Sequence, residues 1–347
     1  MKKVIAMLLS ICLVVACFAG CGKTGDAAKA PEDSAELPIL KVAVQPYLLA
    51  IPVYYMMENG LDKANGFEID LSVYVNGTLI NEALAANEWD VATGGTSAVF
   101  GIATYGAKII ADIDLCTGGA AAYVRPDSPI AAVKDKIAPN VYGDAETLKG
   151  AQILVPTGTL NQYNALKWVE KAGLTSEDVE FVHMDNASSF QAFATGEGDI
   201  TAFSPPMTYQ AEAEGWVTAA SCSDLGLYCW DPLLANPNTL DEKMDTICAF
   251  VKTLYEVQDT LAADKNLAAE WSVKWQAYNG VTTTIEDSLR EVNARPFMTS
   301  AELDKENVGQ TIYDVAEFFN SVDSLSDEDL EKIPANITTE VLDRVFG

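Results

Sequence analysis

Two stretches of this chain share one pattern: Leu84-Ala-Ala-Asn-Glu-Trp-Asp-Val91 and Phe193-Ala-Thr-Gly-Glu-Gly-Asp-Ile200, which lie 109 residues apart. In each, an apolar helix end is followed by a turn that carries Glu, and an Asp then leads into a strand. The pattern predicts that one α/β unit occurs twice. A cleft between two such units is a common place for a small ligand. Asp90 and Asp199 fall at strand starts, away from that cleft, so we interpret them as turn formers rather than as an acid/base pair.

The similarity of the two halves extends backwards from this pattern. Residues 73–76 align with 182–185 at the same offset, and residues 41–44 align with 152–155 after a small shift. Each half alternates strands with helices, which predicts mainly parallel sheets with helices on both faces. We therefore expect two α/β lobes with a hinge and a helical C-terminal tail that packs on the first lobe. The predicted boundaries are 39–122 with 230–347 for the first lobe, and 123–229 for the second.

The N-terminus resembles a bacterial lipoprotein signal. Residues 1–20 have a basic start, an apolar core and small residues before Cys21. This predicts that Cys21 is lipidated; the alternative is an ordinary signal peptide with an incidental cysteine. Residues 21–38 are small and polar and predict a flexible tether. No later apolar run approaches the ~18 residues that span a bilayer. We expect the chain at the outer face of the bacterial cytoplasmic membrane, in contact with it through the lipid anchor only.

Charge and cysteine content exclude several classes of partner. The 347 residues carry a formal net charge of −28, which becomes −30 once Lys2 and Lys3 leave with the signal. Nucleic acid is therefore not an expected partner, because such a chain would be repelled by it. His183 is the only histidine and no C-x-x-C occurs, so we expect no metal and no cofactor. Cys222 and Cys229 could form a disulfide outside the cell or stay as buried free thiols.

The candidate binding residues follow the carboxyl ends of predicted strands, where ligands lie in parallel α/β sheets. These ends are residues 45–47, 94–97, 156–159 and 204–206. Three of the four are rich in Gly, Ser and Thr before a helix N-terminus, where backbone N–H groups and hydroxyls favour a small anion. We predict no catalytic residue and the following ligand-binding residues: Gln45, Tyr47, Gly95, Thr96, Ser97, Thr157, Gly158, Thr159, Asn161, Ser204, Pro206 and Trp230.

Several of these residues have a second interpretation. Thr96 and Ser97 could bind an anion or cap a helix, and the two roles are compatible. Trp230 could form a wall of the cleft and Asp231 could meet a cationic group, or both could pack in the hinge. We expect His183, in a strand, to be structural rather than a ligand contact.

The order and spacing of these stretches resemble the solute-binding proteins of bacterial ABC importers. The branch concerned includes the nitrate, taurine, alkanesulfonate and thiamine-pyrimidine-precursor binders. The resemblance covers about residues 39–230 and is carried by residues 41–45, 58–61, 67–70, 83–97, 148–150, 155–159, 171–178, 196–203 and 211–215. It implies a type II periplasmic-binding-protein fold, whose lobes close over a solute. It also implies a membrane permease that recognises the closed form.

The chain departs from this family in two respects that bear on the solute. Where the family often has an aromatic residue, an acid and a proline, residues 203–206 are Phe-Ser-Pro-Pro. None of the four arginines after the signal lies at the four strand ends, although Arg125 could reach the mouth of the cleft. A neutral or zwitterionic solute, aromatic or not, fits the sequence as well as a simple anion does.

We predict a monomeric solute-binding lipoprotein that is not an enzyme. It would capture a small organic molecule, such as a sulfonate, a carboxylate or a heterocyclic compound, and deliver it to an ABC permease. One alternative is a sensory or adhesive lipoprotein with the same fold. Another is a relative of the enzyme that makes the thiamine pyrimidine, but the Cys-rich motif of that enzyme does not occur in this sequence.

Overall fold

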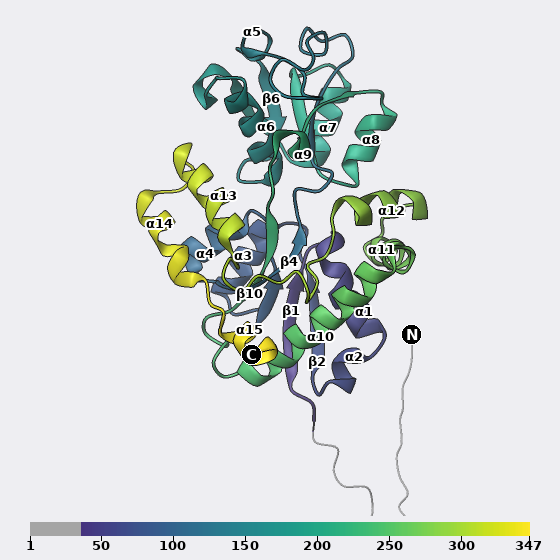
Figure 1. Ribbon diagram of the computed structural model, residues 1–347, viewed down its shortest axis with the longest axis vertical. Coiled ribbons are helices and arrows are strands. Elements are labelled where there is room, and N and C mark those ends of the chain that lie inside the picture. The colour runs from purple at the N-terminus through teal and green to yellow at the C-terminus, as the bar shows by residue number, and fades with distance from the viewer. Residues whose placement is uncertain (1–35) are drawn as a thin grey trace, which may run out of the picture. The chain divides into compact units, whose positions relative to one another are not determined.

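The computed structural model describes residues 36–347 (Figure 1). The predicted signal peptide, Cys21 and most of the tether lie outside the described residues. No helix of the described part is long and apolar enough to cross a membrane. Within residues 36–347, no group of three or more His, Cys, Asp or Glu is placed to hold a metal ion.

Two five-stranded sheets form the core, and they have the same strand order. The first sheet is ordered β2-β1-β3-β10-β4 and the second β7-β6-β8-β5-β9. The strands of the first are β1 (Ile39–Val44), β2 (Glu68–Val73), β3 (Val91–Thr93), β4 (Lys108–Leu115) and β10 (Trp230–Ala235). Those of the second are β5 (Ala121–Val124), β6 (Gln152–Val155), β7 (Glu180–His183), β8 (Ile200–Phe203) and β9 (Val217–Ser221). The matching order confirms the predicted pair of α/β units.

Each sheet holds one strand that runs against its neighbours. β1 pairs in parallel with β2 and β3, and β6 pairs in parallel with β7 and β8. β10 is antiparallel to β3 and β4, and β5 is antiparallel to β8 and β9. These two strands follow the crossings from one sheet to the other, so each sheet receives a strand from a distant part of the chain. The lobe boundaries predicted from the sequence place crossings near residues 122 and 230, as observed, but the strands β5, β9 and β10 were not predicted.

The duplication extends to hydrogen bonds at the strand starts. Asp90 Oδ2 accepts a hydrogen bond from Lys41 N, and Asp199 Oδ2 accepts one from Gln152 N, both at 2.9 Å. In return, the backbone N–H of Asp90 donates to the carbonyl of Lys41, and that of Asp199 to the carbonyl of Gln152. Each Asp therefore links the turn before its own strand to the neighbouring strand, β1 or β6, which is the middle one of the three parallel strands. This is a structural role, in keeping with their interpretation as turn formers.

Helices cover the faces of both sheets. With the first sheet lie α1 (Ile51–Glu58), α2 (Leu61–Ala64), α3 (Gly77–Ala85) and α4 (Ala98–Tyr105). With the second lie α5 (Ala145–Leu148), α6 (Leu160–Lys171), α7 (Asn186–Ala194), α8 (Met207–Ala213) and α9 (Cys222–Leu225). A 3-10 turn, Leu48–Ala50, comes directly before α1. Pro52 lies in the first turn of α1, a position where the N–H that it lacks has no helical partner.

The C-terminal segment is helical, as predicted. It contains α10 (Met244–Ala263), α11 (Lys265–Tyr278), α12 (Ile285–Ala294), α13 (Gln310–Ser321), α14 (Asp327–Lys332) and α15 (Glu340–Phe346). α10 packs on α1, and α15 packs on α10 and β4. In Figure 1 these green and yellow helices surround the first sheet. α10 buries Ile247, Val251 and Leu254, which recur at the three- and four-residue spacing of one helix face.

The described cysteines are free thiols, so the alternative of a disulfide between Cys222 and Cys229 is wrong. The two sulfur atoms have different partners. Cys222 Sγ accepts a hydrogen bond from Asn164 Nδ2 at 3.3 Å, whereas Cys229 Sγ donates to the carbonyl of Trp230.

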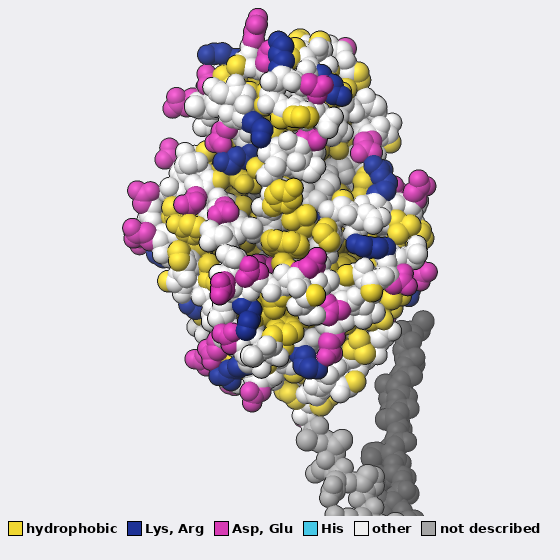
Figure 2. Space-filling model, viewed as in Figure 1, with side chains coloured by type: hydrophobic (Ala, Val, Ile, Leu, Met, Phe, Trp, Pro, Cys, Tyr) yellow, Lys and Arg dark blue, Asp and Glu magenta, His cyan; other side chains and the backbone are white. Residues whose placement is uncertain are grey.

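The acidic character of the sequence is visible on the surface. On the face drawn in Figure 2, acidic side chains are spread over both ends, and apolar side chains gather in a band across the middle.

Candidate solute-binding cleft

A cavity of about 810 Å³ is lined by residues that follow strands of both sheets. This volume lies within the range of small-molecule sites. The first-sheet side contributes, among the predicted residues, Gln45, Tyr47, Gly95, Thr96 and Ser97; the second-sheet side contributes Thr157, Gly158, Thr159, Asn161, Ser204 and Pro206. Trp230 is not among the residues that line the cavity. The strand-end rule therefore brings eleven of the twelve predicted residues to one place.

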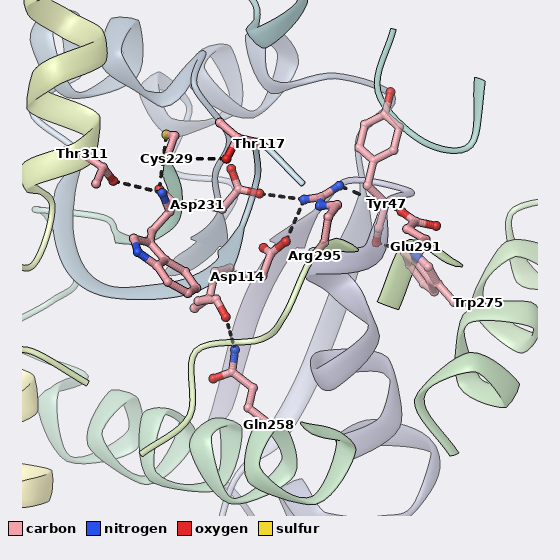
Figure 3. Close-up of polar contacts among 12 residues, drawn as sticks. Tyr47, Asp114, Thr117, Cys229, Asp231, Gln258, Trp275, Glu291, Arg295 and Thr311 are labelled. Carbon is pink, nitrogen blue, oxygen red and sulfur yellow. Dashed lines mark hydrogen bonds and ion pairs between the residues drawn. The ribbon is translucent and has the colours of Figure 1, made fainter. Parts of the chain in front are cut away.

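The loop after β1 is held in position by α11. Trp275 Nε1 donates a hydrogen bond to the carbonyl of Tyr47 at 3.1 Å, and Gln276 Nε2 donates to the carbonyl of Pro46. Figure 3 shows the Tyr47 ring projecting away from Trp275. Burial raises the pKa of Tyr47 and the charge of Arg295 opposes the rise. Tyr47 therefore presents a neutral phenol to the cavity near neutral pH.

Two helices begin at the cavity wall without a side-chain cap. Ser97 precedes α4 and Thr159 precedes α6, and neither side chain accepts a hydrogen bond from its helix. The Thr159 hydroxyl instead donates to the carbonyl of Pro156 at 2.7 Å. Helix capping, one of the two roles considered for Ser97, is therefore not observed. The N-termini of α4 and α6 place partial positive charge at the wall.

On the second-sheet side of the cavity, polar side chains are linked by a series of hydrogen bonds. Ser204 Oγ donates to Asn161 Oδ1 at 3.2 Å, and Asn161 Nδ2 donates to Asn186 Oδ1 at 2.9 Å. His183 also lines the cavity, and its Nδ1 accepts a hydrogen bond from the backbone N–H of Thr157. An accepting Nδ1 places the hydrogen of a neutral imidazole on Nε2. His183 therefore supports the loop after β6 and, contrary to its expected place away from a ligand, is also part of the cavity wall.

Arg295 is a cavity residue that the sequence did not reveal. It follows α12 and is only 4% exposed. Its Nη2 atom pairs with Asp114 Oδ2 at 2.7 Å and with Asp231 Oδ2 at 3.0 Å, while Nη1 lies 4.0 Å from Glu291 Oε1 (Figure 3). No sequence signal links this arginine to the cleft, because it is 64 residues beyond Asp231 and in a loop of the helical segment.

Arg125, the arginine considered from the sequence, lies elsewhere. Its guanidinium donates to the carbonyls of Phe193, Glu197 and Gly198. It also lies 4.4 Å from the centre of the Phe193 ring. These partners belong to the end of α7 and to the turn before β8, and none of them lines the cavity.

Asp231 and Trp230 face different surroundings because successive side chains of a strand point to opposite faces. Asp231 lines the cavity and meets a cationic group, Arg295. The backbone N–H of Trp230 donates to Thr311 Oγ1 at 2.9 Å. Burial raises the pKa of Asp231, with Cys116 and Asp114 adding to the rise and Arg295 opposing it. Burial also raises the pKa of Glu291, to about 7.

Comparison with known proteins agrees with this architecture. Residues 49–264 match the family model described as NMT1/THI5 like. A putative ABC transporter periplasmic binding protein of Brachyspira hyodysenteriae is 35% identical over the whole length of both chains. The structure of the alkanesulfonate-binding protein SsuA from Xanthomonas axonopodis pv. citri superposes with a TM-score of 0.68 at 17% identity, covering 88% of this chain and 99% of that one.

A second solved structure gives the same result. The periplasmic nitrate-binding protein NrtA from Synechocystis superposes with a TM-score of 0.69 at 12% identity, covering 89% of this chain and 88% of that one. These likenesses confirm the predicted type II periplasmic-binding-protein fold. By its sequence match and its whole-length relative, the chain belongs to the NMT1/THI5-like family.

Proposed function

We propose that this protein is an extracytoplasmic solute-binding protein that captures a small organic molecule and delivers it to an ABC importer. The observation that carries the proposal is the cavity of about 810 Å³ built from the strand ends of both sheets. The name of the Brachyspira relative, an ABC transporter periplasmic binding protein, supports the transport role. A sulfonate, a carboxylate or a heterocyclic compound remains within the proposed range of solutes.

The proposed mechanism is closure of two lobes around the solute. We assign residues 39–122 and 230–347 to one lobe and residues 123–229 to the other. The chain crosses between the sheets from β4 to β5 and from β9 to β10, and these crossings form the proposed hinge. A solute that touches both walls stabilises the closed arrangement because it binds that arrangement more tightly. The membrane permease would then recognise the closed form.

We further propose that lipid on Cys21 holds the protein at the outer face of the cytoplasmic membrane as a monomer. The tether that follows would let the binding part reach a permease. Metabolic labelling with radioactive palmitate tests the anchor. Label is expected in the full chain and should be lost in Cys21→Ser; label that persists in this variant contradicts the assignment.

The solute-binding role is tested with the full chain. Native mass spectrometry of the purified protein identifies a co-purifying solute, and X-ray scattering before and after its removal measures closure. Thr96→Ala combined with Thr159→Ala should weaken binding of that solute, because both hydroxyls line the cavity. Thr195→Ala is the matched control, since Thr195 also donates to a backbone carbonyl but does not line the cavity.

The outcomes separate the parts of the proposal. A solute that binds without any compaction would rule out lobe closure. Unchanged affinity in the double threonine variant would place the site elsewhere. Uptake of the identified solute should require this protein; a mutant strain that lacks it and transports normally would contradict the delivery role.

A further inference from the structure

The charged cluster that reaches the cavity through Asp231 and Arg295 carries more acid than base. Asp114, Asp231 and Glu291 surround the single guanidinium of Arg295, and all four side chains are at least nine-tenths buried. Two of the carboxyls are within 3.0 Å of the same nitrogen, Nη2. The positive charge of Arg295 is thus already balanced by carboxyl groups at Nη1 and Nη2, and its Nε atom has no hydrogen-bond partner among the described residues.

Several polar atoms of this cluster have no hydrogen-bond partner among the described residues: Asp114 Oδ1, Asp231 Oδ1, Glu291 Oε1 and Arg295 Nε. Of these three carboxyls, Asp231 alone lines the cavity. Asp231 Oδ2 is paired with Arg295, but Asp231 Oδ1 accepts no hydrogen bond from any described residue. Asp231 is 2% exposed and lines the cavity. A buried carboxylate oxygen without a donor is costly, so a donor supplied by a ligand would stabilise the bound state.

The space beside this oxygen is open because residue 95 is a glycine. A methyl group built on Gly95 would lie 3.6 Å from Asp231 Oδ1 and 4.0 Å from Gln45 Nε2, with no other atom so near. Gly95 and Gln45 also line the cavity. A ligand atom placed a few tenths of an ångström closer than that methyl would be within hydrogen-bond distance of Oδ1.

The other charged residues that line the cavity leave it with more acidic than basic side chains. Among the lining residues of the described chain, Arg295 is the only Lys or Arg, whereas Asp185 adds another carboxyl. The uncapped N-termini of α4 and α6 can favour an anionic group. A solute that carries both an anionic group and a donor for Asp231 would therefore match both features of the lining.

We propose that the solute carries a protonated nitrogen, as in an amine or an amidine, which donates a hydrogen bond to Asp231 Oδ1 in the niche beside Gly95. This inference rests on the proposed function and narrows it: the solute is an organic cation or a zwitterion rather than a simple anion. A charged donor suits this position because it would favour the ionised form of Asp231, which burial disfavours by raising the pKa of that carboxyl. Hydrogen bonds between ionised groups are also stronger than neutral ones.

The test uses the full chain and three probes that share a phenyl ring: benzylamine, benzyl alcohol and benzoate. Their affinities are measured by calorimetry after any co-purified solute has been removed. Benzylamine is expected to bind most tightly. Asp231→Asn should lower its affinity by about tenfold or more, the loss expected for one charge-assisted hydrogen bond. The same variant should remove the preference over benzoate.

Two further variants distinguish a loss of binding at Asp231 from a loss caused by misfolding. Asp114→Asn makes the same chemical change beside Arg295, but Asp114 does not line the cavity, so the order of the three probes should persist. Gly95→Ala places a methyl group in the niche at ordinary contact distances, so the fold should be retained and benzylamine affinity should fall.

Each outcome has a definite meaning. Tighter binding of benzoate than of benzylamine, or unchanged benzylamine affinity in Asp231→Asn and Gly95→Ala, overturns the inference and leaves the solute-binding function standing. If no probe binds, the test turns to the co-purified solute. A solute without a basic nitrogen overturns the inference. Weaker binding of a nitrogen-containing solute by Asp231→Asn supports it. If neither a probe nor any solute binds, the proposed function fails together with the inference.

Discussion

Among single residues, Asp90 and Asp199 have the same role in the two sheets but different surroundings. Both accept a hydrogen bond at a strand start, and Asp90 also pairs with Lys243 Nζ at 2.6 Å. Asp199→Ala should lower the free energy of unfolding by about 1 kcal/mol, the usual value of one such hydrogen bond. Asp90→Ala should cost more, because Lys243 then loses its partner. Urea denaturation measures both; a change in solute affinity with unchanged stability would contradict the structural assignment.

Glu291 should make stability depend on pH. Burial raises its pKa from 4.5 to about 7, with Arg295 opposing the rise and Asp114 adding to it. The folded chain therefore binds more protons than the unfolded chain between these two values. Stability should fall as pH rises from about 4.5 to 7, by on the order of 1 kcal/mol or more, and level off above that.

Glu291→Gln tests this dependence, because it removes the titration and keeps the shape of the side chain. The stability of the variant should change less across the same pH window, measured by urea denaturation at several pH values. Glu286→Gln, an exposed change on the same helix, should keep the wild-type slope. If both variants show that slope, Glu291 is not its source.

The candidate site shows which residues a sequence can identify. Residues directly after parallel strands were predictable, since the position of a strand end follows from the hydrophobic pattern. Arg295 was not, because it reaches the cavity from a loop between helices that has no repeated pattern. Trp230 and Asp231 are adjacent, and only their alternation in β10 decides which of them faces the cavity.

At the scale of elements, the parallel strands were predictable from their alternation with helices, and the antiparallel ones were not. β5 and β10 pair with strands that come from other parts of the chain, such as β10 with β3, about 140 residues earlier in sequence. Local pattern carries no information on such pairing. Most C-terminal helices were predictable individually from their spaced apolar residues. The short helix α14 buries none of its residues and was not predicted.

The contact between α11 and the loop after β1 allows a test at this scale. Trp275→Phe keeps a ring beside Tyr54 but removes the N–H that donates to the Tyr47 carbonyl. Stability should fall by about 1 kcal/mol, and solute affinity should weaken several-fold because Tyr47 is held less firmly. Trp271→Phe is the control, since Trp271 contacts the same Tyr54 ring without bonding to this loop. Equal affinity losses in the two variants would show that ring packing, and not the hydrogen bond, positions Tyr47.

For the whole molecule, a few side chains connect the two sides of the cavity outside the chain crossings. Arg290 of α12 pairs with Glu212 of α8 at 2.6 Å and lies 4.3 Å from the centre of the Tyr209 ring. α12 packs on α11, whereas α8 packs against the second sheet through Ala211. In Figure 1, α12 lies below α8. This contact therefore favours an arrangement in which the proposed lobes are close together.

Arg290→Ala should shift the chain toward a more open arrangement. The pair is partly exposed, so its contribution is at most about 1 kcal/mol, or roughly fivefold in solute affinity. X-ray scattering of the solute-free variant should show a larger radius of gyration, and calorimetry should show the weaker binding. Arg344→Ala removes an equally exposed pair within α15 and should change neither quantity. If the two variants behave alike, surface charge rather than a contact across the cleft sets the separation of the lobes.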